Sequence, residues 1–224
     1  MRRVELPRRV ELPSQFFAAE KVRLGMRLPA ATALHASLQR EAPKGVQIVR
    51  FGEAPSASAS GWAKVITAAG DRPTEEAAAE QWQLEFAAHE PDLRNRMYFA
   101  IDEADGAPIG TATAWLYTGR AEQREARVHW VSVVPRAQGR GLAKVLLGAV
   151  VQTGRALHAD AENFCLVTHT QAARAISMYL QVGFVPTGLG PDNQTPDGRS
   201  EMTAEELAGW AAMREAGLEL PEYK

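Results

Sequence analysis

The stretch that decides the fold runs from Val131 to Lys144 and reads VSVVPRAQGRGLAK. Its first residues are typical of the end of a buried strand, Pro135 stops that strand, and two glycines then open a helix. Glycine lets the backbone come close to a ligand, and free N–H groups at a helix N-terminus bind anions such as phosphate. The stretch therefore predicts a phosphate-binding turn, beside which Arg140 and Lys144 add positive charge.

Three interpretations of this turn compete. A nucleotide P-loop ends in Gly-Lys-Ser/Thr, which is absent here. A dinucleotide fingerprint needs a third glycine and an acidic residue about 20 residues further on. Only Gly139 and Gly141 fit that pattern, and the next strand, FCLVTH over 164–169, carries no acid. The third interpretation is a plain strand-to-helix turn that binds nothing.

Around the turn, the hydrophobic pattern predicts a mixed α/β chain. Strands are expected over 46–51, 97–102, 108–117, 127–134 and 164–169, with a short one from 184. Helices are expected over 15–24, 62–69, 73–89, 141–157, 172–181 and 203–216, the last opened by a capping box at Thr203 and Glu206. We expect a mixed sheet of about six strands with helices on both faces.

The same pattern suggests three regions. Residues 1–45 are expected to be an N-terminal extension that is partly flexible, and they carry the hexapeptide RRVELP twice, over 2–7 and 8–13. Residues 46–187 are expected to form the domain. Residues 188–224 are expected to be a loop and a helix packed on it.

Composition narrows the function classes. The chain has 224 residues, 46% of them hydrophobic and 23% charged, which is typical of a folded soluble protein. Its net charge of −2 lacks the basic excess of nucleic-acid-binding domains. The longest apolar runs are about seven residues, whereas a membrane span needs about 20. A single cysteine, Cys165, forms no intrachain disulfide, so the expected compartment is the cytoplasm.

Two motifs resemble those of the GCN5-related N-acetyltransferase (GNAT) family. Residues 138–143, QGRGLA, fit its (Gln/Arg)-x-x-Gly-x-(Gly/Ala) signature. Residues 175–184, AISMYLQVGF, resemble its second hallmark, Ala-Ile-x-x-Tyr-x-x-x-Gly-Phe. The resemblance covers about residues 46–186 and implies a GNAT-like acyl-CoA N-acyltransferase fold, in which the parallel strands 127–134 and 164–169 splay apart.

The resemblance also implies a site for acetyl-CoA as co-substrate, and no metal is expected. The backbone of Val131, Ser132 and Val133 would pair with the pantetheine arm. The pyrophosphate would lie on the turn formed by Gln138, Gly139, Arg140, Gly141, Leu142, Ala143 and Lys144. Family members often have an asparagine where this chain has Ala172, so Thr170 or Gln171 is expected to take its place.

The expected catalytic residues follow from the same resemblance. Tyr179 matches a tyrosine that often protonates the departing thiolate, although a core aromatic is the alternative. His129 is the first candidate for the base that deprotonates the acceptor, because its ordinary pKa lies near neutrality. His169 is the second candidate and Glu125 the third. Cys165 is expected to lie in the core.

The predicted function is transfer of an acetyl group from acetyl-CoA to a primary amine of a small molecule or peptide, by direct attack in a ternary complex. Two rivals stay open: a catalytically silent acyl-CoA-binding sensor, and a protein N-terminal or lysine acetyltransferase. No nucleic-acid or membrane partner is expected, and a homodimer is one assembly that the sequence allows. Several side chains are candidates for the acceptor pocket, although core packing or a solvated helix face suits most of them: Trp62, Trp82, Phe86, Trp115 and the glutamates at 75, 76, 80, 85 and 90.

Overall fold

The fold is described from a computed structural model, which covers residues 21–116, 125–159, 161, 163–189 and 201–221. One mixed sheet of seven strands has the order β2-β3-β4-β5-β6-β1-β7. Its strands are β1 (Arg23–Pro29), β2 (Val46–Arg50), β3 (Met97–Asp102), β4 (Pro108–Leu116), β5 (Glu125–Val133), β6 (Asn163–His169) and β7 (Val185–Thr187). The helices are α1 (Ala59–Ala68), α2 (Glu75–Glu85), α3 (Glu90–Arg96), α4 (Leu142–Leu157), α5 (Ala173–Gln181) and α6 (Ala204–Glu215).

The additional strand, β1, lies within the segment predicted to be an N-terminal extension. It pairs with β6 over seven residues and with β7 over three, both antiparallel. Leu24, Met26 and Leu28 alternate along it and are buried. Such alternation is the period of a strand. The prediction that a helix extends to residue 24 is therefore wrong, because β1 begins at Arg23. The rest of that helix, like the hexapeptide repeat, lies outside the described residues.

Helices cover both faces of the sheet, as predicted. Along β3, Met97, Phe99 and Ile101 contact the cluster under α1 and α2. The residues between them, Tyr98 and Ala100, contact the larger cluster that includes α4. Beyond β7, α6 lies along β1 and begins with the predicted capping box.

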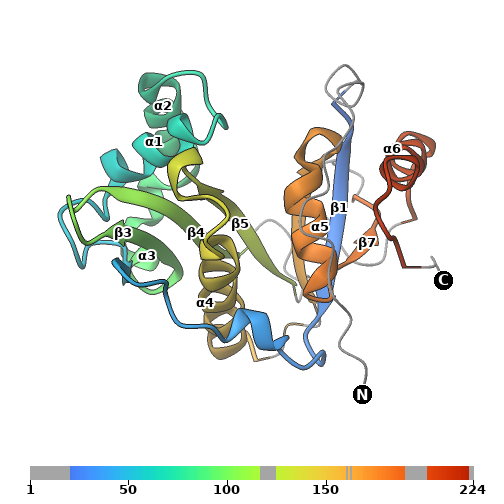
Figure 1. The fold of residues 1–224 in the computed structure, drawn as a ribbon, viewed down its shortest axis with the longest axis horizontal. Helices are drawn as coiled ribbons and strands as arrows, with labels where there is room; N and C mark the ends of the chain where they lie inside the picture. Colours follow the sequence, from blue (N-terminus) through green and yellow to red (C-terminus); the bar gives the residue numbers. More distant parts are fainter. Residues whose placement is uncertain (1–20, 117–124, 160, 162, 190–200, 222–224) are drawn as a thin grey trace.

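The strands β5 and β6 form the one parallel pair among the described strands, and they separate soon after they meet. They are paired over three residues each, Glu125 to Arg127 with Asn163 to Cys165. Beyond that point β5 continues along β4, whereas β6 continues along β1. Figure 1 shows the result as two halves, with β5 and α4 in one and β1, β6 and α5 in the other. The predicted splayed pair is confirmed.

The segment between β1 and β2 joins these halves by crossing α4. Its short turn at Ala36–Leu38 lies against Gly148, where a Cβ atom would sit 1.9 Å from the carbonyl oxygen of Leu38. Glycine is unfavourable inside a helix, so this close approach explains its presence.

Gly148→Ala should therefore destabilise the protein. Alanine normally favours a helix by about 1 kcal/mol over glycine, but the clash should lower the free energy of unfolding by about 1–3 kcal/mol. Urea unfolding measures the change. Gln152→Ala, an exposed site on the same helix, is the control and should stay within about 0.5 kcal/mol. A Gly148→Ala protein as stable as the original would contradict the packing of this segment on α4.

Candidate active site

A bulge in β5 places two consecutive side chains on one face of the sheet. The register between β4 and β5 shifts between Thr111 and Thr113, and Trp130 has φ of 50°, which is rare for a bulky residue. His129 and Trp130 would otherwise point to opposite faces. Here both hydrogen-bond the same carboxylate oxygen of Glu85, at 3.0 Å from His129 Nε2 and 2.6 Å from Trp130 Nε1.

Burial governs the protonation of this group. Burial lowers the pKa of His129, an effect that the hydrogen bond to Glu85 only partly opposes. For Glu85, burial acts to raise the pKa, but the hydrogen bonds from His129 and Trp130, with the charge of Arg127, together hold it below its ordinary value. At neutral pH a neutral imidazole therefore faces a charged carboxylate.

A second carboxylate, that of Asp71, contacts β5 at Ser132, three residues after His129. The Ser132 hydroxyl donates a hydrogen bond of 2.5 Å to Oδ2 of Asp71. Asp71 follows directly after the end of α1, where Gly70 has φ of 86° and the Asp71 N–H donates to the Ile66 carbonyl at 3.0 Å. This closure of the helix end fixes the backbone of Asp71.

Tyr179 and His169 lie on the other side of the splay. Burial raises the pKa of Tyr179, and the negative charge of Asp71 raises it further, so the hydroxyl stays protonated at neutral pH. Burial also lowers the pKa of His169, assisted by the charge of Lys21 and opposed by Asp71. Nδ1 of His169 is buried and has no hydrogen-bond partner within the described residues. Ser132 thus holds Asp71 beside β5, whereas Tyr179 on α5 and His169 at the end of β6 belong to the opposite side of the splay.

The glycine turn has the geometry of an anion cradle. Gly139 and Gly141 adopt φ of 78° and 83°, and a Cβ at either would meet nothing within 4 Å. Among the described residues, no backbone hydrogen bond uses the N–H groups from Gly139 to Ala143, whereas the Lys144 N–H donates to the Gly141 carbonyl. The turn is thus open to an anion through the five amides from Gly139 to Ala143, whereas the amide of Lys144, which the prediction included, is already bonded.

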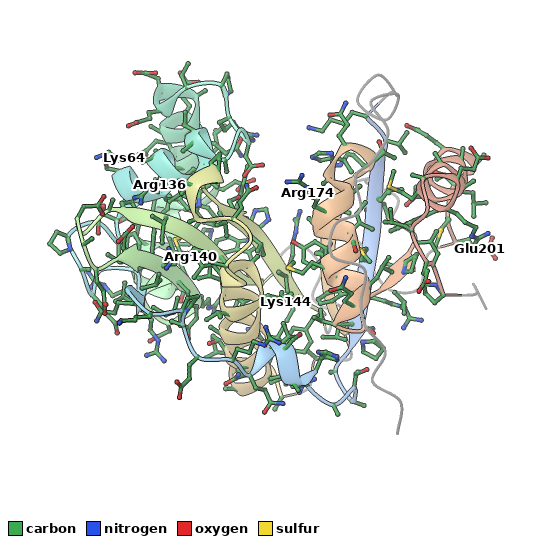
Figure 2. All side chains as sticks on the ribbon, viewed as in Figure 1. Lys64, Arg136, Arg140, Lys144, Arg174 and Glu201 are labelled. Carbon is green, nitrogen blue, oxygen red and sulfur yellow. The ribbon has the colours of Figure 1, made fainter. Side chains whose placement is uncertain are left out.

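The charged side chains of this turn tie it to its surroundings. Arg140 donates to the Lys44 carbonyl at 3.1 Å, and Lys144 reaches Oε1 of Gln181 on α5 at 3.0 Å. Figure 2 shows Lys144 on the side of α4 that faces α5, whereas Arg174 lies near the opposite end of α5 from Gln181. Burial and the charge of Arg40 lower the pKa of Lys144.

The backbone of Val133 faces away from β4. Val134 donates to the Ile109 carbonyl, so the neighbouring residue Val133, opposite Gly110, directs its N–H and C=O to the other side of the strand. Its carbonyl there accepts a hydrogen bond of 3.0 Å from the Gln138 side chain. The Val133 N–H therefore points along the unpaired edge of β5, which is where the sequence predicts an extended ligand.

Other predicted residues have different surroundings. Thr170 is buried, and its hydroxyl accepts a hydrogen bond from the Val22 N–H, so its contact with a cofactor stays a prediction. Three aromatic candidates for the acceptor pocket, Trp62, Trp82 and Phe86, are fully buried core residues, and Cys165 is buried as expected. The side chain of Glu125 lies outside the described part of the chain. Within that part, no group of side chains could hold a metal ion and no helix is long and apolar enough to cross a membrane.

Sequence patterns did not predict the contacts of the two carboxylates. Glu85 is one of the candidates for the acceptor pocket, most of which were expected on a solvated helix face, yet it follows Ala78 and Trp82 on the buried stripe of α2, and that position is the signal for its contacts. Asp71 has no such signal, because its partner Ser132 is 61 residues away.

The fold and this site agree with one family. The sequence model described as "Acetyltransferase (GNAT) family" matches residues 62–184, more than half of the chain, and the chain belongs to this family. No curated protein matches it in sequence.

Solved structures show the same fold at low sequence identity. A GCN5-related N-acetyltransferase from Sphaerobacter thermophilus is 18% identical with a TM-score of 0.56, covering 75% of this chain and 49% of its own. A tandem GNAT protein from the clavulanic acid biosynthesis pathway is 17% identical with a TM-score of 0.55, and the match covers 74% of this chain and 50% of that protein. A GNAT acetyltransferase from Colwellia psychrerythraea is 13% identical with a TM-score of 0.53, and the match covers 75% of this chain and 53% of that protein. The chain thus spans about half the length of these proteins.

His129 and His169 make the folding stability depend on pH. Their pKa values in the folded protein lie below the ordinary value of about 6.5, so the unfolded chain binds protons first as the pH falls. The free energy of unfolding should decrease from about pH 7 downwards through 6.5, until the folded protein also takes up those protons. Urea unfolding at several pH values measures this slope.

The double variant with His129→Gln and His169→Gln should flatten the dependence of the free energy of unfolding on pH. His89→Gln, which changes an exposed histidine instead of these two, is the control and should leave that dependence unchanged. A stability that is constant between about pH 7.5 and 5.5 in the original protein would contradict this account of the two buried imidazoles.

Proposed function

We propose that the protein transfers an acetyl group from acetyl-CoA to a primary amine of a small molecule or peptide, by direct attack in a ternary complex. The observation that carries the proposal is the open edge of β5 beside the free amides that follow Gly139. An unpaired strand edge accepts an extended amide chain as an added strand, and the turn amides accept a diphosphate. Acetyl-CoA contains both groups in sequence.

The side chains around the splay suit the chemistry of this transfer. An alkylammonium has a pKa near 10 and must lose a proton before it attacks. We assign this proton to His169, because its imidazole is neutral at neutral pH and its Nδ1 has no other partner among the described residues. His129 donates its Nε2 hydrogen to Glu85, and it stays the alternative base.

The free amine attacks the thioester carbon, a C–N bond forms, and the carbonyl oxygen becomes an oxyanion that the N–H of Val133 can stabilise. The C–S bond then breaks, and the Tyr179 hydroxyl gives its proton to the sulfur. The tyrosine recovers a proton from the nitrogen, so the products are the amide, free CoA and one proton held by His169.

Tyr179→Phe separates catalysis from binding. The variant should lower the rate of CoA release with an amine acceptor by about 10²- to 10⁴-fold, because the leaving thiolate loses its proton donor. Acetyl-CoA present at 100 times its Kd should still stabilise the variant by about 2.7 kcal/mol, as in the original protein. Thiol release across a panel of amines and thermal unfolding provide the two measurements.

The outcomes are distinct. Turnover that is unchanged in Tyr179→Phe would remove this residue from the mechanism. Stabilisation of the original protein by acetyl-CoA without turnover of any amine would favour a silent acyl-CoA-binding sensor instead. Met178→Leu, a conservative change at the neighbouring position on α5, is the control and should preserve both readouts.

A further inference from the structure

We infer that the carboxylate of Asp71 binds the ammonium group of the acceptor, which makes this chain selective for amines that are cationic before they react. The inference rests on the proposed function, and it assigns the acceptor end of the same site. It comes from the position of Asp71 at the splay and from the groups that surround its charge.

The carboxylate is held in place without being neutralised. Ser132, a buried residue of β5, donates to Oδ2 and leaves Oδ1 available. No described residue forms an ion pair with Asp71: the neighbouring Arg72 donates to its backbone carbonyl at 2.9 Å, and the guanidinium lies 4.9 Å from the centre of the Trp130 ring. An exposed carboxylate that forms no ion pair within the described part of the chain attracts a cation.

The proposed base and the proposed proton donor are both uncharged at neutral pH. Tyr179, on α5, is 6% exposed, and burial raises the pKa of its hydroxyl, which therefore keeps its proton. His169 at the end of β6 interacts with Asp71, and it has a buried nitrogen without a partner in the described residues. A cation at Asp71, which Ser132 holds next to Val133, therefore lies at the open edge of β5, on the opposite side of the splay from the proposed base and proton donor.

This arrangement orders the first steps. Asp71 binds the ammonium, His169 removes one proton from it, and the resulting amine nitrogen is already beside the unpaired edge of β5. Once neutral, the nitrogen loses its charge attraction to Asp71, which frees it to attack. An acceptor that is neutral from the start, such as an aromatic amine, gains nothing from the carboxylate.

Asp71→Asn tests the inference, because asparagine keeps the shape and an oxygen for Ser132 but removes the charge. The two probes are an alkylamine acceptor taken from the panel, which is protonated at neutral pH, and aniline, which is uncharged. For the alkylamine, kcat/KM should fall about 10- to 100-fold, mainly through KM, since a hydrogen bond to a charged group is lost. For aniline, it should change less than about threefold.

The control is Glu215→Gln, which removes the same charge from an exposed position on α6 and should affect neither substrate. Stabilisation by acetyl-CoA should persist in Asp71→Asn, which shows that the co-substrate site is intact. An equal loss with both amines, or no loss with either, would overturn the role of Asp71 while leaving the transferase activity standing. Absence of transfer to every amine by the original protein would instead refute the proposed function, and this inference with it.

Discussion

The divergence of β5 from β6 after three paired residues is the constraint on which the site depends. Each strand is bound to a different half of the molecule: β6 pairs with β1 over its full length, and β5 pairs with β4. The bulge at His129 and Trp130 bends β5, and two carboxylates from the α1–α2 region hold the bent strand through His129, Trp130 and Ser132. A straight β5 would continue to pair with β6, and its edge would then be closed to any ligand.

The same construction sets the protonation states at the site. His169 and Tyr179 lie on the β6 side, where burial keeps the imidazole neutral and the phenol protonated. Asp71 lies on the β5 side, fixed by the end of α1 and the Ser132 hydroxyl. Environments that push the pKa values of neighbouring groups apart are what acid and base roles require at one pH. The splay thus separates strand edges and also distributes the proton donors and acceptors across them.

The sequence predicted the parts of the fold that depend on local patterns. The turn at Gly139 and Gly141 follows from glycine and helix-start chemistry, and α4 and the hairpin of β3 and β4 follow from periodicity. The strand β1 was missed, although Leu24, Met26 and Leu28 alternate, because arginines and prolines nearby suggested a tail. Its role depends on pairing with residues about 140 positions away, which local patterns do not encode. Asp71 and the bulge at Trp130 depend on contacts of the same long-range kind.

The most direct test of the open edge of β5 is amide hydrogen exchange at Val133, measured with and without coenzyme A. In the free protein, the Val133 N–H points away from β4 and should exchange faster than that of Val134, which donates to the Ile109 carbonyl. Saturating coenzyme A should slow exchange at Val133 and at the amides from Gly139 to Ala143, while Val134 changes little. Exchange at Val133 that is already slow in the free protein, or that coenzyme A leaves unchanged, would contradict the account.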